Sequence, residues 1–317
     1  MNIKIGIIMD PIESINIKKD STFTMLLEAQ RRDYKIYYIN IKNLYWEEGE
    51  AYGQSKIIKI QNEQHLSWFS YHEKKTIKLS ILDVILMRKD PPVDLEFIYA
   101  TYILEFAEKK GVLVINKPKS LRHYNEKIFT CNFNTIIPET LITKKIKNIY
   151  NFISQHNDII IKPLNEMGGS SVFKISKYDV NTNVILENMT KKETKYCMIQ
   201  KFIPDIKYGD KRILVINGNP IPLCLARIPQ KGQIRGNLAI GGVGKVQKLT
   251  DHDLNIIKKL SPILKEKGLF FVGIDIIGKY LTEINITSPT CIQEIQKEYN
   301  KSINEIFFDF IESKLNK

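Results

Sequence analysis

The sequence lacks several features that would assign it to a familiar class. Its four cysteines show neither a close pair nor the spacing of a metal site, so we expect no disulfide framework and no zinc site. No apolar run approaches the roughly 18 residues of a membrane span, and the run at residues 5–9 is too short for a signal segment. We therefore expect a soluble, cytoplasmic protein with no membrane partner. The cysteines are Cys131, Cys197, Cys224 and Cys291.

Two further absences concern ligands. No GxGxxG sequence follows the first predicted strand, so a dinucleotide site is not supported. The net charge of +12 would suit nucleic acid, but the lysines are spread along the whole chain and aromatic residues do not alternate with basic runs. We therefore expect small anionic substrates and no nucleic acid. The alternative, a basic nucleic-acid-binding module, predicts an affinity for DNA or RNA that falls steeply with salt.

The first part of the chain alternates predicted strands with predicted helices. Apolar runs predict strands at 3–9, 35–41, 83–87 and 112–115, and the segments between them predict helices at 21–32, capped by Ser21, and at 94–110. Such alternation is typical of a mostly parallel sheet, whose ligands gather at the carboxyl ends of the strands. Arg88 follows one strand and is placed to bind a carboxylate there, or simply to pair with Asp90.

Residues 271–291 are predicted to form two strands joined by a tight turn at Gly278. Side chains alternate along a strand, so Glu283 and Asn285 point to one face while Thr282 points to the other, apolar face. One face of this hairpin is therefore rich in oxygen ligands. It is either a site for a hard cation and phosphate oxygens, or an ordinary edge hairpin with solvated acids.

The position of Asp275 depends on the register of this hairpin. A two-residue turn would pair Asp275 with Thr282 and direct its carboxylate to the apolar side. A loop with an odd number of residues, such as 278–280, pairs it with Glu283. The cation site requires the second arrangement.

The middle of the chain contains basic and glycine-rich segments. Lys127 lies on a predicted helix at 125–133, and Lys162 ends a predicted strand at 159–162. The glycine pair that follows, in the sequence MGGSS, forms a turn whose amides can approach phosphate closely. Each signal taken singly also fits a surface lysine or a plain hairpin turn.

The last third of the chain combines a hairpin, a long glycine-rich segment and two helices. Asn217-Gly218 predicts a hairpin turn. Residues 228–245 show no clear periodicity, which indicates a functional lid or a disordered loop. Thr250 is expected to cap a helix that reaches residue 267, and residues 301–315 are expected to form a terminal amphipathic helix.

Taken in order, these segments resemble a known superfamily. Lys127, Lys162, MGGSS, QKFI, LARIP, RGNLAIGG, GIDIIG and TEINITSPT are similar to the ATP-grasp proteins. Within them the chain resembles the bacterial glutathione synthetases almost end to end, from MDPI and INIKKDS through LMRKDPP and EFIYATYILE to TSPTCI. One departure is Asn165-Glu166, which stand where Asp-Gly is expected before MGG.

The resemblance implies an α/β protein with an ATP-grasp fold preceded by a Rossmann-like N-terminal domain. The expected division is a substrate-binding domain at 1–122, an ATP-grasp lid subdomain at 123–202 and an ATP-grasp catalytic subdomain at 203–317. The implied reaction joins glycine to γ-L-glutamyl-L-cysteine through an acyl phosphate and gives glutathione, ADP and phosphate. It uses ATP as co-substrate and Mg²⁺ or Mn²⁺ as cofactor, in a homotetramer. The closest rivals are other carboxylate–amine ligases of the same fold.

The resemblance also assigns roles to residues. Those expected at the nucleotide are Lys127, Lys162, Gly168, Gly169, Ser170, Gln200, Lys201, Phe202, Ile203 and Asp210. Those expected at the metal are Asp275, Glu283 and Asn285. Those expected to stabilise the transferring phosphoryl group and the reaction intermediate are Arg212, Arg227 and Arg235. Those expected at the dipeptide are Arg88, Asn285, Ser288 and Pro289. Cys291 is expected to have no catalytic role, because the chemistry needs no enzyme thiol.

Overall fold

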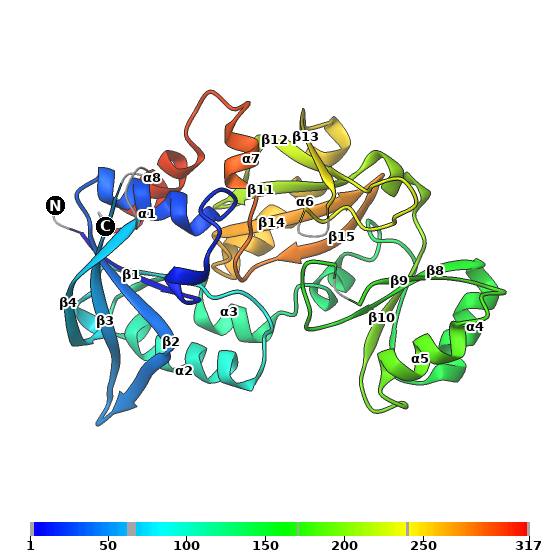
Figure 1. The fold of residues 1–317 in the computed structure, drawn as a ribbon, viewed down its shortest axis with the longest axis horizontal. Helices are drawn as coiled ribbons and strands as arrows, with labels where there is room; N and C mark the ends of the chain where they lie inside the picture. The colour runs from blue at the N-terminus through cyan, green and yellow to red at the C-terminus, as the bar shows by residue number, and fades with distance from the viewer. Residues whose placement is uncertain (1–2, 62–67, 170, 239–240, 316–317) are drawn as a thin grey trace.

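The computed structural model describes residues 3–61, 68–169, 171–238 and 241–315, which form three sheets with their helices (Figure 1). The strand orders are β4-β3-β2-β1-β5-β6, β7-β10-β8-β9 and β13-β12-β11-β14-β15. None of the helices within these ranges has the length and hydrophobicity needed to cross a bilayer.

The six-stranded sheet contains the expected parallel strands. They are β1 (Lys4–Met9), β2 (Lys35–Glu47), β5 (Val84–Arg88) and β6 (Leu113–Ile115). Between them lie α1 (Ser21–Arg31), α2 (Leu95–Lys109) and the short 3-10 turns Ile12–Ser14 and Leu79–Ile81. The prediction of an alternating, mostly parallel arrangement is confirmed. The N-cap of α1, however, is Asp20 and not Ser21, because the Asp20 carboxylate accepts a hydrogen bond of 2.7 Å from the Phe23 amide.

Two long antiparallel strands extend this sheet and were not predicted. They are β3 (Glu50–Ile60) and β4 (Phe69–Lys78). Their side chains are mostly polar or half-buried, so they carry little of the apolar signal on which strand prediction depends.

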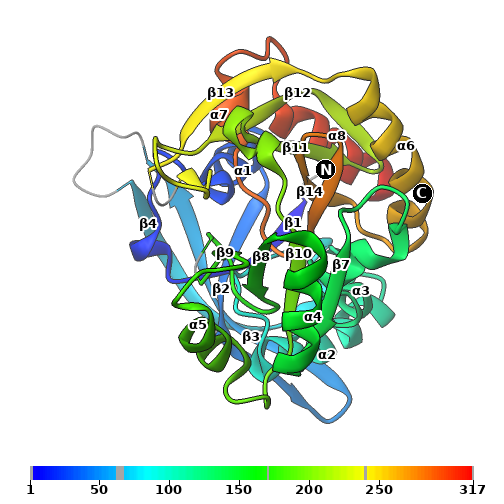
Figure 2. The same cartoon turned by 90° about the vertical axis from the view of Figure 1, so that its right-hand side faces the viewer.

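The four-stranded sheet and its two helices form what we call the small body, residues 140–201. Its strands are β7 (Thr140–Thr143), β8 (Asp158–Pro163), β9 (Phe173–Ser176) and β10 (Cys197–Lys201). Helices α4 (Ile146–His156) and α5 (Thr182–Thr190) lie on the outer side of the sheet (Figure 2). They enclose a core of their own, which includes Ile149, Ile161 and Leu186.

The five-stranded sheet carries the predicted acidic hairpin. Its strands are β11 (Asp210–Ile216), β12 (Asn219–Ile228), β13 (Val243–Lys248), β14 (Phe271–Ile277) and β15 (Tyr280–Asn285). The Asn217-Gly218 turn is confirmed, with positive φ at both residues and Ile216 paired with Asn219. Helix α6 (Asp251–Glu266) begins at the predicted cap, Thr250, which forms a capping box with Asp253.

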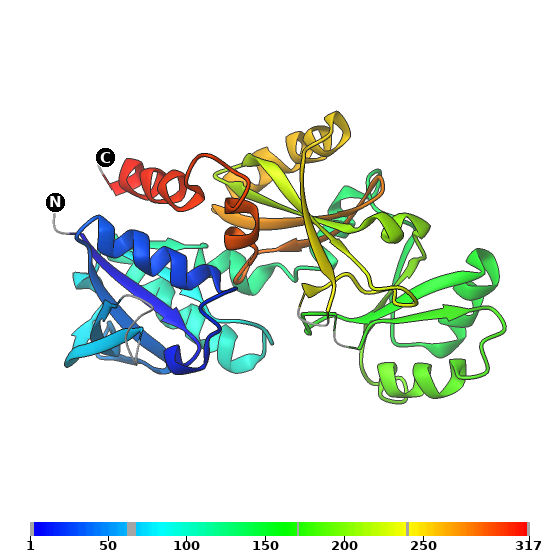
Figure 3. The same cartoon turned by 45° about the horizontal axis from the view of Figure 1, so that its top comes forward.

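The connecting elements tie the two larger sheets into one body. They are α3 (Pro118–His123), the 3-10 helices Ile128–Phe133 and Pro204–Tyr208, α7 (Ile292–Gln296) and α8 (Ile303–Leu315). The predicted helix at 125–133 is thus a shorter 3-10 helix. Apolar side chains of α1 and β1 share a core with α7, α8 and β14, whereas the small body projects away from this main body (Figure 3).

Candidate active site

The register of the β14–β15 hairpin brings two carboxylates together. Asp275 is paired with Glu283, as the cation-site hypothesis requires. The pairing was expected to come from a loop with an odd number of residues. That expectation was wrong, because Ile277 pairs with Tyr280 and the turn has two residues. The extra residue lies in the strand: a β-bulge shifts the register next to Asp275, and Thr282 is the unpaired residue.

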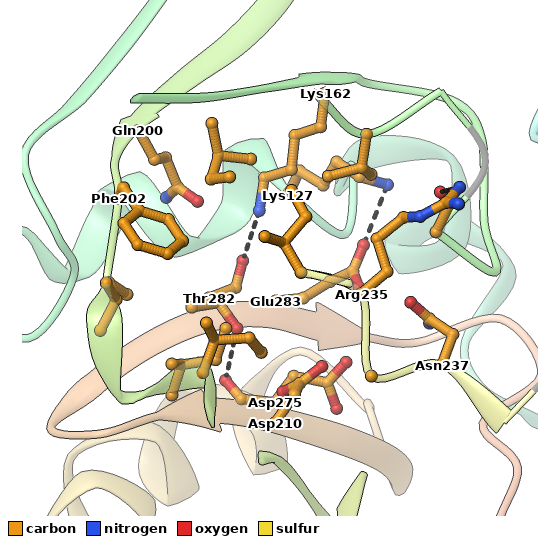
Figure 4. A pocket seen from close by; sticks show the side chains of 18 of the residues that line it. Lys127, Lys162, Gln200, Phe202, Asp210, Arg235, Asn237, Asp275, Thr282 and Glu283 are labelled. Carbon is orange, nitrogen blue, oxygen red and sulfur yellow. Dashed lines mark hydrogen bonds and ion pairs between the residues drawn. The ribbon is translucent and has the colours of Figure 1, made fainter. Parts of the chain in front are cut away.

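The bulge also changes the direction of Thr282. It was expected on the apolar face, but it lines a cavity together with Glu283 (Figure 4). Ile284 and Ile286 follow the expected alternation and are fully buried in the core. The interrupted alternation is therefore local to the bulge.

Two arginines surround the carboxylate of Asp275. Arg212, directly opposite on β11, donates from Nε and Nη2 to the two carboxylate oxygens at 2.5 and 2.9 Å. Arg227 Nη2 lies 2.9 Å from Oδ2, and the Asn285 amide donates to the same oxygen at 3.1 Å. Burial would raise the pKa of Asp275, but the two guanidinium groups outweigh it and hold that pKa well below its usual range.

Asp210 belongs to the same charged cluster. Its Oδ2 accepts a hydrogen bond of 2.5 Å from Arg227 Nη2, and its Oδ1 is buried with no partner. Burial raises the pKa of Asp210 to about 6, although Arg227 opposes that shift. The free oxygen is available to a hydroxyl donor from a ligand.

Two lysines approach the hairpin from the side of the small body (Figure 4). Lys127 Nζ lies 2.9 Å from Glu283 Oε1 and donates to the backbone oxygen of Glu166 at 2.7 Å. Lys162 Nζ donates to the backbone oxygen of Thr282 at 3.3 Å. Burial lowers the pKa of Lys162 to about 8, which Glu283 partly offsets. Both lysines, which singly resembled surface residues, are therefore buried in a site.

The lysines and acids line a cavity between the small body and the five-stranded sheet. One part of it is apolar, with Ile160, Phe202 and Ile277, and the other part is charged. Such a division suits a ligand with a flat apolar end and an anionic end. The residues predicted at the nucleotide that line it are Lys127, Lys162, Gly168, Gly169, Gln200, Lys201, Phe202, Ile203 and Asp210. Ser170 lies outside the described residues.

The glycine loop meets the long segment after β12 in the lining of this cavity. Arg235 Nη1 donates to the backbone oxygen of Gly169 at 3.2 Å. Gly169 has φ +77°, and a Cβ there would lie 2.4 Å from the Asn237 amide oxygen, so the contact depends on glycine. The predicted unstructured segment is shorter than expected, because β13 begins at Val243.

A second cavity lies next to the first, on the same face of the hairpin and toward Asn285. The predicted residues that line it are Arg212, Arg227, Asn285, Ser288 and Pro289. Gly168 and Asn237 line both cavities, so the two adjoin at the glycine loop.

Arg88 stands behind this second cavity. It donates to the Pro289 backbone oxygen at 2.9 Å and to Thr22 Oγ1 at 3.1 Å, and it is 6% exposed. Asp90 instead accepts a hydrogen bond from Ser288. The alternative in which Arg88 pairs with Asp90 is therefore not the observed one, and Arg88 supports the loop that carries Pro289.

Glu126 is a residue that the sequence analysis did not select. Its Oε1 accepts from the amides of Ile286 and Thr287 at 2.7 and 3.0 Å, and from Thr287 Oγ1 at 2.9 Å. Its own backbone oxygen accepts from the Ile284 amide at 3.0 Å. Glu126 thus fixes the chain between Asn285 and Ser288. Its partners lie about 160 positions away, so the only available signal was its place next to Lys127.

Cys291 lines the second cavity but is not set up as a nucleophile. Burial raises the pKa of its thiol, although Arg212 and Arg227 oppose the shift. A nucleophilic cysteine requires a lowered pKa. The expectation that this thiol takes no part in the chemistry agrees with this environment.

Comparison with known proteins places this arrangement in a family. Residues 3–122 match the model for the N-terminal domain of prokaryotic glutathione synthetase, and residues 126–300 match the model for its ATP-grasp domain. The chain belongs to the prokaryotic glutathione synthetase family. It is 57% identical over 316 residues to glutathione synthetase of Buchnera aphidicola subsp. Schizaphis graminum, covering 100% of this chain and 98% of the relative. It is 54% identical over 313 residues to that of Escherichia coli K12, covering 99% of each.

The solved structures agree on the fold. The chain is similar to the ATP-grasp ligase PsnB complexed with minimal precursor, Mg and ADP, with a TM-score of 0.62 and 14% identity over 99% of this chain and 98% of that one. The predicted ATP-grasp fold is confirmed, and this glutathione synthetase family member is an ATP-dependent ligase that joins glycine to γ-glutamylcysteine. The nucleic-acid-binding alternative is therefore rejected.

Replacing Glu126 tests whether its carboxylate positions the chain that carries Ser288 and Pro289. Glu126→Ala removes three accepted hydrogen bonds, so we expect the KM for γ-glutamylcysteine to rise about 10-fold while the KM for ATP stays within about two-fold. Glu126→Gln keeps one acceptor oxygen and is expected to restore the dipeptide KM. Steady-state kinetics with each substrate varied in turn measures both.

A purely architectural Glu126 would give a different pattern. Both KM values would then change together, in step with the free energy of unfolding measured in urea, and the Gln variant would restore both KM values together with stability.

Proposed function

We propose that phosphoryl transfer and peptide-bond formation take place across the β14–β15 hairpin. The observation that carries this proposal is that Asp275 and Glu283 line the first cavity, while their neighbour Asn285 lines the second. ATP occupies the first cavity and the dipeptide the second. The γ-phosphate then meets the cysteinyl carboxylate at the hairpin.

The reaction class explains why lysines and arginines gather at the hairpin. A carboxylate is a poor electrophile, and its conversion to an acyl phosphate provides a leaving group that an amine can displace. Phosphoryl transfer needs charge neutralisation and in-line positioning more than covalent help. Arg212 and Arg227 line the second cavity beside Asp275, where they would stabilise the transferring phosphoryl group and then the oxyanion of the tetrahedral intermediate. Arg235 approaches the same region from the loop after β12.

The first cavity supplies the remaining contacts to the nucleotide. Lys127 and Lys162 act as compact charges on the phosphates, and the amides of Gly168 and Gly169 approach them closely. The adenine lies along Gln200, Lys201, Phe202 and Ile203, where the cavity is most apolar. The unpaired Oδ1 of Asp210 accepts a hydrogen bond from the ribose.

Asp275, Glu283 and Asn285 have the donor chemistry of a magnesium or manganese site. They offer two carboxylates and an amide oxygen from paired strands, and Mg²⁺ prefers oxygen ligands of this kind. Throughout the described ranges no three His, Cys, Asp or Glu side chains are grouped to hold an ion alone. Phosphate oxygens and water would complete the coordination, which agrees with the Mg and ADP of the PsnB complex. When bound, the ion supplies charge neutralisation at the phosphates.

The dipeptide contacts divide into two kinds. Asn285, Ser288 and Pro289 line the second cavity and would touch the substrate directly. Arg88 lies behind this cavity and acts through the Pro289 backbone, to which it donates a hydrogen bond of 2.9 Å.

We retain the functional division into domains at 1–122, 123–202 and 203–317. The small body, with its separate core, corresponds to most of the second segment. We also propose a cytoplasmic homotetramer, because oligomers with closed symmetry are the common form of soluble enzymes and the reaction uses cytosolic metabolites.

Omission of single substrates tests the assignment of the reaction. Phosphate release is measured from ATP with γ-glutamylcysteine and glycine, each left out in turn. We expect full release only with both present, because acyl phosphate formation requires the dipeptide and turnover requires the amine. Release at the same rate without either would refute the assignment.

Glu283→Gln tests the metal proposal. The variant keeps the shape of the side chain but removes one anionic ligand, so we expect the Mg²⁺ concentration needed for half-maximal activity to rise at least about 10-fold. The free energy of unfolding in urea should change far less than the use of magnesium and nucleotide. Glu187→Gln, on the far side of α5, is the matched control. An equal loss of folding and metal use would make Glu283 architectural.

Shortening the segment at 229–242 tests its role as a cover. Its Arg235 contacts the glycine loop in the lining of the cavity, and an acyl phosphate hydrolyses wastefully when water reaches it. We expect ATP affinity to remain within about two-fold while phosphate release exceeds peptide formation. The ratio of the two products measures this, and a ratio of one in the shortened variant would contradict it.

A further inference from the structure

A third cavity lies between the main body and the small body, and the reaction scheme does not use it. Its volume is about 210 Å³. It shares Glu126 with the second cavity, and Lys127 and Glu166 with the first, so an occupant would lie beside both substrate cavities. Residues 164–166 line it from the small body, and the lining from the main body consists of Pro91, Val93, Ile98 and residues 121–127.

Two residues of this lining carry buried polar atoms that the protein leaves unpaired. Arg122 Nη1, a hydrogen-bond donor, and Asn165 Oδ1, an acceptor, have no partner among the described residues. Natural structures rarely leave a buried polar group unpaired, because the group has lost its hydrogen bonds to water. The two atoms come from the two bodies that enclose the cavity. A single ligand with one acceptor and one donor can therefore satisfy both.

The walls of the third cavity are held by interactions of their own. Arg122 Nη2 donates to a carboxylate oxygen of Glu105, and the guanidinium group lies over the Tyr102 ring at 4.4 Å. On the small-body side, the backbone oxygen of Leu164 accepts a hydrogen bond of 2.8 Å from Asn125 Nδ2. A ligand therefore needs little rearrangement of the protein in order to bind, which favours affinity.

The charged residues of the lining favour a ligand with no net charge. Two cations, Arg122 and Lys127, are matched by two acids, Glu126 and Glu166. Within this balanced lining, the unpaired donor and the unpaired acceptor call for groups of opposite sign. A carboxylate on the guanidinium group and an ammonium group on the amide oxygen would form charge-assisted hydrogen bonds, which are the strong ones. These are the two groups of a free amino acid.

The rest of the lining is apolar and leaves room for a side chain. Val93, Ile98 and Leu121 form this part on the main-body side. A cavity of roughly 150 Å³ can hold a benzene ring. The volume of about 210 Å³ therefore admits a branched aliphatic side chain together with the ammonium and carboxylate groups.

We propose that the third cavity binds a free α-amino acid with an apolar side chain. The carboxylate lies on Arg122, the ammonium group lies on the amide oxygen of Asn165, and the side chain packs against Val93 and Ile98. The site is separate from the reaction, because none of these four residues lines either substrate cavity.

Occupation of the third cavity is expected to affect nucleotide binding. Asn165 adjoins Glu166, whose backbone oxygen accepts from Lys127 Nζ at 2.7 Å, and the same Nζ lies 2.9 Å from Glu283. A ligand that ties Asn165 to Arg122 fixes the loop that positions this lysine. We therefore expect a saturating amino acid to lower the Kd for ATP several-fold, and ATP to lower the Kd for the amino acid by the same factor. This coupling rests on the proposed placement of ATP in the first cavity.

Isothermal titration calorimetry of the full chain with L-leucine, without nucleotide or substrates, tests the site. We expect saturable binding of one leucine per chain. Isocaproate lacks the ammonium group and isoamylamine lacks the carboxylate, so each is expected to bind at least about 10-fold more weakly. Absence of saturable leucine binding would overturn the proposal, and so would equal affinities for the three compounds.

Substitutions at Asn165 test the contact itself. Asn165→Leu removes the acceptor and is expected to weaken leucine binding at least about 10-fold. Asn165→Asp places a carboxylate beside the ammonium group and is expected to strengthen leucine binding several-fold, with no gain for isocaproate. Asn255→Leu alters an exposed asparagine on α6 and is the matched control. Equal losses in the two Asn165 variants would overturn the assigned contact.

A variant that fills the cavity separates it from the substrate cavities. Val93→Phe adds volume to the apolar wall, so we expect leucine binding to be lost while the KM values for ATP and γ-glutamylcysteine stay within about two-fold. In the wild type, saturating γ-glutamylcysteine should leave leucine bound. Leucine binding that survives Val93→Phe and is displaced by the dipeptide would overturn the proposal, because leucine would then occupy the second cavity.

The coupling is measured by titrating ATP with and without saturating leucine. An unchanged Kd for ATP would overturn the coupling, whereas the amino-acid site and the placement of ATP would both stand. Loss of substrate-dependent phosphate release in a wild type that binds leucine would instead refute the reaction scheme and leave the third-cavity site standing.

Discussion

The buried ion pair between Asp275 and its two arginines is the interaction on which the rest of the site depends. Asp275 is only 2% exposed and could not remain ionised there without Arg212 and Arg227. The arginines are nearly as buried and equally need an anion. Because the carboxylate and the arginines neutralise one another's charge, the cluster holds three charged groups in fixed positions at the junction of the two cavities. Breaking a buried pair typically costs about 3–5 kcal/mol, so this cluster is also part of the fold.

The arrangement places cations beside the acids at the centre of the site. Asp210, Asp275 and Glu283 each have a neighbour among Arg212, Arg227, Lys127 and Lys162. A triphosphate would therefore enter a site whose acids are already neutralised. The cations are already in position before the triphosphate binds. They can therefore stabilise its negative charge with little reorganisation of the protein.

The sequence predicted the parts of the fold that depend on local rules. The Asn217-Gly218 turn, the Thr250 cap and the alternation of Ile284 with Glu283 each follow from a few neighbouring residues. The bulge at Thr282 could not be predicted in this way, since it is decided by the pairing of two strands. Glu126 was missed and the contact of Arg88 with Pro289 was not foreseen for a similar reason, because their partners lie roughly 160 to 200 positions away. The family resemblance gathered residues that spacing alone could not bring together.

The contact between Lys127 and the main chain at Glu166 bears on the Asn165-Glu166 departure that precedes the glycine loop. The lysine binds the carbonyl oxygen of residue 166, while the Glu166 side chain points toward Lys195, 3.8 Å away. A peptide oxygen is present whatever amino acid is encoded there. The replacement of the expected Asp-Gly by Asn-Glu therefore changes two side chains of the motif but keeps the backbone oxygen that Lys127 binds. The contact that Lys127 makes here therefore does not depend on which side chain stands at position 166.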